Sequence, residues 1–179
     1  MDTRTSPIPV RLESVRDALR AQGLAAVLVP SSDPHLSEYL PERWQGREWL
    51  SGFTGSMGTL VVTTERAAIF ADSRYWAQAE RELRGSGIDL VKVNIGAAAQ
   101  QHEWIAANVA KGGTLAVDGQ VIGLAAAQQL KSALDAAGIA LRTSADVLAA
   151  AWGDRPGLPQ ARVYAHQPPH ATTPRAAKL

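Results

Sequence analysis

The polar side chains that could take part in chemistry are concentrated in two short segments. The first contains Asp33, His35 and Glu38 and directly follows the continuous apolar run Leu24–Val29, which is typical of a buried strand. Ligands of α/β proteins bind in loops at the carboxyl ends of strands, so these three residues are candidate binding residues. Asp33-Pro34 is also an ordinary turn signal, and that interpretation stays open beside the functional one.

The second segment, Asp72–Trp76, lies where the predicted strand Ala67–Phe70 gives way to a helix. Asp72 or Ser73 can cap this helix, which places Arg74 in its first turn. The helix dipole disfavours a cation there. Two interpretations follow: Arg74 extends toward an anionic partner, or it is a plain surface arginine.

The histidines do not form a recognisable metal site. His102-Glu103 lacks a second histidine four residues later, so there is no His-Glu-x-x-His motif. His166 and His170 have the helical spacing of two ligands, but the prolines between them prevent a helix. We interpret these histidines as solvated side chains of a tail.

The glycines of Gly52–Gly58 could present backbone N–H groups to an anion, but their spacing matches no phosphate-binding loop and they precede a strand. We therefore favour a turn that permits close approach. Ser56 does not lie in a G-x-S-x-G elbow, which argues against a serine hydrolase. Seven of the ten aromatic residues lie in the stretch from Tyr39 to Trp76, as a core cluster or a contact face, and we favour the core.

The pattern that must position these residues is one of helices alternating with short buried strands. Apolar residues of the first helix recur at Leu12, Val15 and Leu19 and end before Gly23. Further strands are predicted at 59–63, 67–70, 89–93, 114–117 and 140–143, and helices at 73–84, 100–109, 123–137 and 145–152. The first two of these strands are close enough for a hairpin through Thr64-Glu65-Arg66. This order predicts an α/β fold with a mixed sheet.

Length and composition restrict the function further. The 179 residues suffice for one full domain, and a net charge of +1 argues against binding nucleic acid. The chain has no cysteine, which excludes disulfides and thiol chemistry. Met1–Pro9 has no signal-peptide core and no run is long enough to span a membrane, so we expect a soluble cytoplasmic protein.

The end of the chain predicts a domain boundary. Gly153–Pro169 has the composition of a linker, and Thr173-Pro174 is a typical helix opening that is followed by only five residues. We assign residues 1–153 to the domain and 154–179 to a linker and the start of a following, absent domain. The chain is therefore interpreted as the front of a longer protein.

Three ordered motifs resemble a known family: Leu28–Tyr39 (LVPSSDPHLSEY), Arg47–Thr59 (REWLSGFTGSMGT) and Phe70–Ala79 (FADSRYWAQA). They are similar to the N-terminal domain of Xaa-Pro aminopeptidase (aminopeptidase P), a domain type shared with creatinase and prolidase. The resemblance covers Val10 to about Pro159, and Trp152–Pro156 is similar to the family's exit from this domain.

The resemblance implies a mostly parallel mixed sheet with helices on both faces, of ribonuclease-H-like topology. It implies that the full-length protein is a metallo-exopeptidase that removes an N-terminal residue preceding proline. In the family, two divalent metal ions, commonly manganese, are held by two Asp, one His and two Glu of the C-terminal catalytic domain. None of these ligands has a counterpart here, so we expect no cofactor in this chain and no activity from it alone.

The same resemblance implies roles for individual residues. Arg74 matches the family arginine implicated in the substrate region, Glu38 falls on the position expected to pair with it, and His35 belongs to the same segment. Ser73 stands where many relatives have glycine. The domain is expected to shape access for peptides with proline second, to pack against its own catalytic domain and to support a homodimer.

Two other functions compete with this interpretation. A stand-alone binding or adaptor module would have kept the fold without a catalytic domain, and a genuine stop after Leu179 would favour it. A hydrolase that uses Ser56 with His35 lacks both the nucleophile elbow and an ordered base.

Overall fold

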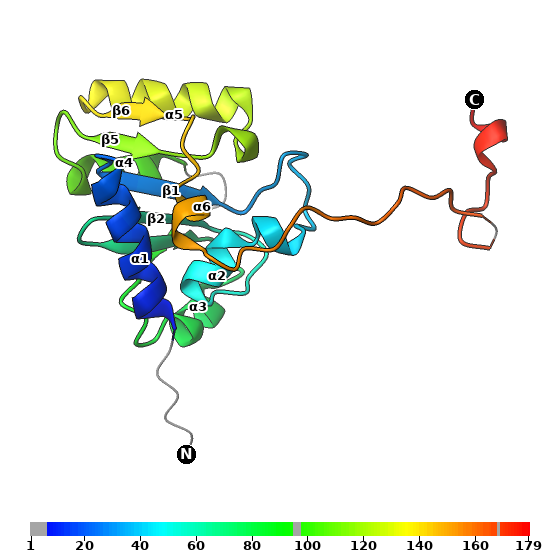
Figure 1. The fold of residues 1–179 in the computed structure, drawn as a ribbon, viewed down its shortest axis with the longest axis horizontal. Coiled ribbons are helices and arrows are strands. Elements are labelled where there is room, and N and C mark those ends of the chain that lie inside the picture. The colour runs from blue at the N-terminus through cyan, green and yellow to red at the C-terminus, as the bar shows by residue number, and fades with distance from the viewer. Residues whose placement is uncertain (1–6, 95–97, 168) are drawn as a thin grey trace, which may run out of the picture.

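The fold is built around one six-stranded sheet (Figure 1). A computed structural model describes residues 7–94, 98–167 and 169–179. The strands are β1 (Ala26–Pro30), β2 (Thr59–Thr63), β3 (Ala67–Ala71), β4 (Asp89–Lys92), β5 (Thr114–Ala116) and β6 (Ala140–Arg142), in the spatial order β4-β3-β2-β1-β5-β6. Only β2 runs antiparallel to its neighbours, so the predicted mostly parallel mixed sheet is confirmed.

The helices are α1 (Ile8–Ala21), α2 (Gly46–Ser51), α3 (Trp76–Glu82), α4 (Ala98–Asn108), α5 (Leu124–Ala136) and α6 (Val147–Ala151). Three 3-10 turns accompany them: η1 (Glu42–Trp44), η2 (Gly119–Val121) and η3 (Arg175–Ala177). The sequence predicts no element at η1 and α2, because segments this short show no readable periodicity. η3 stands where a longer helix opening was expected.

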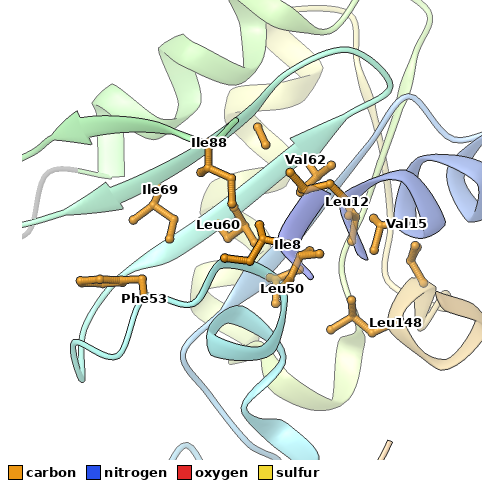
Figure 2. Packing of buried hydrophobic residues seen from close by; sticks show 14 of the residues in the cluster. Ile8, Leu12, Val15, Leu50, Phe53, Leu60, Val62, Ile69, Ile88 and Leu148 are labelled. Atoms are coloured by element: carbon orange, nitrogen blue, oxygen red, sulfur yellow. The ribbon is translucent and has the colours of Figure 1, made fainter. Parts of the chain in front are cut away.

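Both faces of the sheet are covered, as predicted. Side chains of successive strand residues point to opposite faces, so Val27 and Val29 pack in one core while Ala26 and Leu28 pack in the other. The first core holds residues of α1, α2, α3 and α6, and Figure 2 shows Leu12 and Val15 of α1 beside Leu148 of α6. The second core holds residues of α4 and α5.

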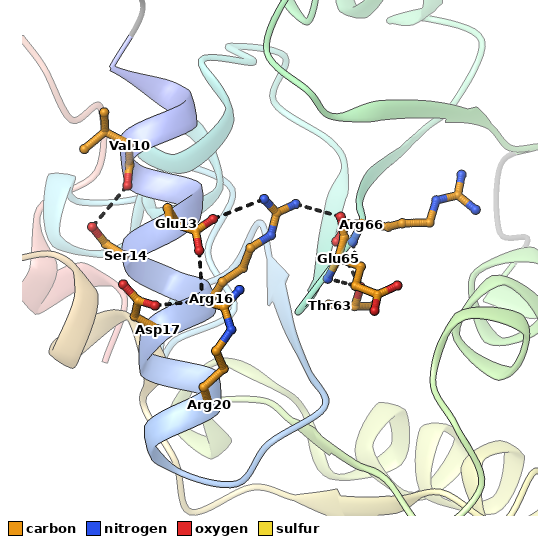
Figure 3. Close-up of polar contacts among 9 residues, drawn as sticks. All are labelled: Val10, Glu13, Ser14, Arg16, Asp17, Arg20, Thr63, Glu65 and Arg66. Carbon is orange, nitrogen blue, oxygen red and sulfur yellow. Dashed lines mark hydrogen bonds and ion pairs between the residues drawn. The ribbon is translucent and has the colours of Figure 1, made fainter.

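The outward face of α1 is polar and touches the β2–β3 hairpin (Figure 3). Arg20 donates to Glu13 and Asp17, while Arg16 reaches across to the backbone oxygen of Glu65 in the hairpin turn. This face therefore carries ion pairs. The spacing of the apolar residues of α1 predicts that the opposite face is polar, but it does not predict which ion pairs form there.

Beyond Pro156 the described chain runs away from the domain (Figure 1). Residues 157–167 and 169–179 are almost all exposed and form no strand. The assignment of 154–179 to a linker stays a prediction. Residues 1–6 and Pro168, which the sequence analysis placed in the chain start and the linker, lie outside the described residues.

Candidate functional site

The candidate site residues lie along one edge of the sheet. Because β1 and β3 are parallel, the loop that begins at Ser31 and the loop that begins at Asp72 leave from the same edge. β2 runs the other way, so the segment Gly52–Gly58 that leads into it lies at this edge too. The register places Thr59 between Pro30 and Phe70.

Asp33 organises the loop after β1. Its carboxylate accepts the backbone N–H groups of His35 (3.0 Å) and Ser37 (2.9 Å) and the Ser37 hydroxyl (2.6 Å). The Ser37 hydroxyl above all holds the pKa of Asp33 below its ordinary value. Asp33 is 3% exposed, so it stabilises the loop and is not available to a ligand. The turn interpretation of Asp33-Pro34 is thus the better one.

His35 and Glu38 are presented to solvent by that loop. The His35 side chain is 87% exposed and lies 3.9 Å from the Asp33 carboxylate. Glu38 borders a hollow of about 250 Å³, which we call the site hollow, together with Ser31, Trp44 and Arg47. The structure therefore leaves both predicted residues free to contact another molecule.

Arg74 is held by its neighbour Asp72. Arg74 Nε donates to Asp72 Oδ1 (2.9 Å) and Nη2 donates to Oδ2 (2.7 Å), and the Arg74 backbone N–H donates to Oδ1 (3.1 Å). The Arg74 side-chain hydrogen bonds hold the pKa of Asp72 below its ordinary value. With 54% of its side chain exposed, Arg74 presents an oriented guanidinium at the edge of the sheet.

Two expectations about this segment were wrong. α3 begins at Trp76 and not at Ser73, and neither Asp72 nor Ser73 caps it. The Asp72 carboxylate instead accepts hydrogen bonds from Arg74. The Tyr75 backbone N–H donates to the Asp72 carbonyl, which forms a turn before the helix starts.

The expected pairing of Arg74 with Glu38 is also absent. The nearer carboxylate of Asp72 takes the guanidinium, and Arg74 lines a separate hollow of about 280 Å³ with Met57, Thr59 and Asp72. Within the described residues, Glu38 and Arg74 thus border different hollows at the same edge.

Arg47 is a residue that the sequence analysis did not single out. It is 5% exposed, its Nη2 donates to the Gly55 carbonyl, and its guanidinium lies 4.8 Å from the centre of the Phe53 ring. Nε and Nη1 have no hydrogen-bond partner in the described part of the chain, and burial lowers the pKa of Arg47 to about 10. Arg47 lies three residues before Leu50 in the Arg47–Thr59 motif, which is the spacing of residues on one face of a helix. This spacing is the signal in the sequence that could have indicated the burial of Arg47.

The segment Gly52–Gly58 packs on α3 through its backbone and side chains. Thr54 donates its N–H and hydroxyl to Glu82, and the Ser56 hydroxyl shares a hydrogen bond with Tyr75 (2.6 Å). A Cβ added at Gly55 would lie 2.4 Å from the Phe53 ring, so glycine is needed for this close approach. That result supports the turn interpretation.

The aromatic cluster is only partly core. Trp44 is 9% exposed, as expected, whereas Tyr39 is 86% exposed at the rim of the site hollow. Ser56, whose partner is Tyr75, makes no hydrogen bond with His35 among the described residues, so the structure offers no nucleophile–base pair there.

The described residues also offer no metal centre. Within residues 7–94, 98–167 and 169–179 no three His, Asp or Glu side chains come together in a way that could hold an ion. These described residues do not supply the donor set that the metal pair of the resembled family requires. Over the same ranges, every helix falls short of the length and apolarity that a membrane crossing requires.

The sheet order, the helices on both faces and the loops at its carboxyl edge define an α/β domain. Residues 11–149 match the model of the Creatinase/Prolidase N-terminal domain, and the chain belongs to that family. The resemblance drawn from the three motifs is thereby confirmed.

Curated relatives of the chain are peptidases of much greater length. Xaa-Pro aminopeptidase 2 of Rattus norvegicus is 34% identical over 158 residues, 87% of this chain and 23% of that protein. A probable Xaa-Pro aminopeptidase P of Talaromyces marneffei is 34% identical over 171 residues, 94% of this chain and 26% of that protein. The chain spans about a quarter of the length of these relatives.

Solved structures agree with the fold. The X-prolyl aminopeptidase of Caenorhabditis elegans, described as a cytosolic enzyme with a di-nuclear active site, superposes with a TM-score of 0.74 at 28% identity, over 84% of this chain and 26% of that one. The N-terminal domain of peptidase PepQ from Mycobacterium tuberculosis superposes with a TM-score of 0.63 at 22% identity, over 80% of this chain and 98% of that one. The second likeness concerns the fold alone.

Proposed function

We propose that this chain is the N-terminal, non-catalytic domain of a metal-dependent Xaa-Pro aminopeptidase, which releases the N-terminal residue that precedes proline. The observation that carries the proposal is the match of 87–94% of this chain to about a quarter of each such enzyme.

The proposed role of the domain is to shape the entrance to the catalytic site. Its carboxyl edge presents the oriented guanidinium of Arg74 and the exposed side chains of His35 and Glu38, and we assign substrate binding to these three residues. Exposed apolar side chains lie in the loops of the same edge, at Leu36, Tyr39 and Met57. Such an edge suits contact with a peptide and with the domain's own catalytic domain.

For the whole protein we propose two divalent metal ions, manganese in the first place, bound by the catalytic domain, together with a homodimer in the cytoplasm. The Caenorhabditis elegans relative, cytosolic and with a di-nuclear site, supports the location and the number of ions. The residues of this chain contribute orientation and restriction of the substrate, not ligands of the ions.

The test uses the full-length enzyme. Arg74→Ala should lower kcat/KM for Xaa-Pro tripeptides more than tenfold while the metal content is unchanged. Arg66→Ala is the matched control, because Arg66 is 55% exposed and also lies 2.7 Å from an aspartate, Asp89, but at the opposite edge of the sheet. Equal kinetics for the Arg74 and Arg66 variants would contradict the role of Arg74.

The alternative function, a stand-alone binding module, is distinguished by the length of the reading frame. If the reading frame stops after Leu179, the peptidase proposal fails and pull-down experiments become the next step. If several hundred further codons include two Asp, one His and two Glu as metal ligands, the module is excluded.

A further inference from the structure

Arg155, just beyond α6, is the centre of a dense set of contacts. Its side chain is 8% exposed, and its Nη1 donates to Asp146 Oδ2 (2.6 Å). Asp146 also caps α6, because its Oδ1 accepts the Ala149 N–H (3.0 Å). One carboxylate therefore fixes both the start of α6 and the segment that follows its end.

Arg155 is also tied to the distant turn η1 by crossed hydrogen bonds. Arg155 Nε donates to the Arg43 carbonyl (3.0 Å), and Arg43 Nη1 donates back to the Pro156 carbonyl (2.9 Å). The guanidinium of Arg155 lies 5.2 Å from the Trp44 ring centre and 5.9 Å from that of Trp152. Breaking one of these contacts alone would leave the two segments joined by the others.

Stacked rings extend the set to α2 and α1. Trp152 stacks on Trp49 with ring centres 4.6 Å apart and planes 10° from parallel. Arg11 of α1 lies 5.1 Å from the Trp49 ring centre and donates to the Trp49 carbonyl (2.6 Å). The segment 152–156, which we call the exit segment, is thus anchored on α2, η1 and α6, and through Trp49 it is linked to α1.

The anchoring ends abruptly at Pro156. In residues 157–167 and 169–179, the hydrogen bonds and ring contacts that the structure shows stay within the tail itself, such as the Tyr164–His166 rings. Pro156 still accepts a hydrogen bond from Arg43, whereas the described residues after it make no hydrogen bond or ring contact with the domain.

The exit segment shares its partners with the site hollow. Trp44, which contacts Arg155, also lines the site hollow, as does Gln45 of the same turn. We infer that Arg155 is a positioning residue: it locks the exit segment against η1, and so fixes together the direction in which the chain leaves the domain and the wall of the site hollow. The inference does not depend on the proposed peptidase function.

The test compares Arg155→Ala with Arg162→Ala, which removes the same charge from an exposed position of the tail. In Arg155→Ala, hydrogen exchange of the Trp152 amide should be at least tenfold faster, while the central amides of Leu60 and Val61 change less than twofold. The indole signal of Trp44 should shift in Arg155→Ala and in Arg43→Ala but not in Arg162→Ala. Arg155→Lys, which keeps the charge but not the fork, should be intermediate.

The chain has no cysteine, so the exit direction can be measured with introduced ones. Spin labels at Ser132→Cys and Leu158→Cys should give a distance distribution at least twice as broad when Arg155 is alanine. Arg155→Ala behaving like Arg162→Ala in all three readouts would overturn the inference. The inference would also be overturned if hydrogen exchange became faster by the same factor at the Trp152, Leu60 and Val61 amides. That result would report global destabilisation and not the loss of a local contact. Either result leaves the proposed peptidase function untouched, because no readout measures peptide hydrolysis.

Discussion

Asp72 and Arg74 are two residues apart in the chain, and both carboxylate oxygens of Asp72 accept hydrogen bonds from the guanidinium of Arg74. Nη1 of Arg74 makes neither of these bonds. The pair therefore orients a cation and leaves one of its terminal nitrogens for a further acceptor.

The first prediction concerns the titration of Asp72. The Arg74 hydrogen bonds lower the pKa of this carboxyl, so Arg74→Ala should raise it toward the value of a free aspartate. Carbon-13 NMR of the carboxyl group during a pH titration measures the change. Arg66→Ala should leave Asp72 as it is, and an unchanged titration in Arg74→Ala would show that another group holds the carboxylate.

The second prediction is that Asp33 supports the fold in a pH-dependent way. Asp33→Ala removes three hydrogen bonds to a buried carboxylate and should lower the free energy of unfolding by about 1.5–3 kcal/mol at pH 7. The folded-state pKa of Asp33 is lowered, so the stabilisation is present above the unfolded-state pKa and is lost as the pH falls through the folded value.

Urea unfolding at several pH values checks this. The gap between wild type and Asp33→Ala should narrow below the ordinary aspartate pKa of about 4. A gap that stays constant to low pH would mean that the carboxylate charge does not matter.

The third prediction concerns Gly55. A methyl group there would meet the rings of Phe53 and Tyr75, at 2.4 and 2.8 Å, so Gly55→Ala should destabilise the fold by about 1–3 kcal/mol. Gly153→Ala is the control, because a Cβ at Gly153 meets nothing within 4 Å. Thermal unfolding of both variants measures the difference, and equal melting temperatures would contradict the packing argument.

The fourth prediction is that the charge of Arg47 does not stabilise the domain. Arg47→Met keeps most of the buried volume and removes a cation with two nitrogens that lack a hydrogen-bond partner among the described residues, so the free energy of unfolding should stay the same or rise by at most about 2 kcal/mol. Arg47→Ala leaves a cavity next to Phe53 and should cost about 2 kcal/mol. Equal losses in the two variants would show instead that the charge itself is needed.

The strands and most helices could be predicted because their signals are local. The apolar run that contains β1 and the short turn between β2 and β3 are readable without tertiary information. The start of α3 was misjudged because Asp72 can either cap a helix or bind the guanidinium of Arg74, and sequence alone does not decide between these partners.

The site was predictable only in part, since its geometry depends on contacts between distant residues. His35, Glu38 and Arg74 lie at one edge of the sheet, and their role in substrate binding stays a prediction. The expected Glu38–Arg74 pair could not be judged from the sequence, because it depends on the distance between two loops. Arg47 was missed because burial of a charged residue runs against its ordinary preference for the surface. The Arg155–Arg43 contacts join residues more than a hundred positions apart, which no periodicity reveals.

The place of β2 in the sheet also has a consequence for the order of folding. β2 and β3 are joined by a three-residue turn, whereas β1 pairs with β5 only after most of the chain has been made, as Ala26 opposite Leu115 shows. Closing a short loop loses less entropy, so we expect the hairpin to be formed in the folding transition state and the β1–β5 pair to follow. Val61→Ala in β2 should then slow folding, while Leu115→Ala in β5 should mainly speed unfolding. The half of the sheet that carries Arg74 would thus be in place before the β5–β6 half joins it.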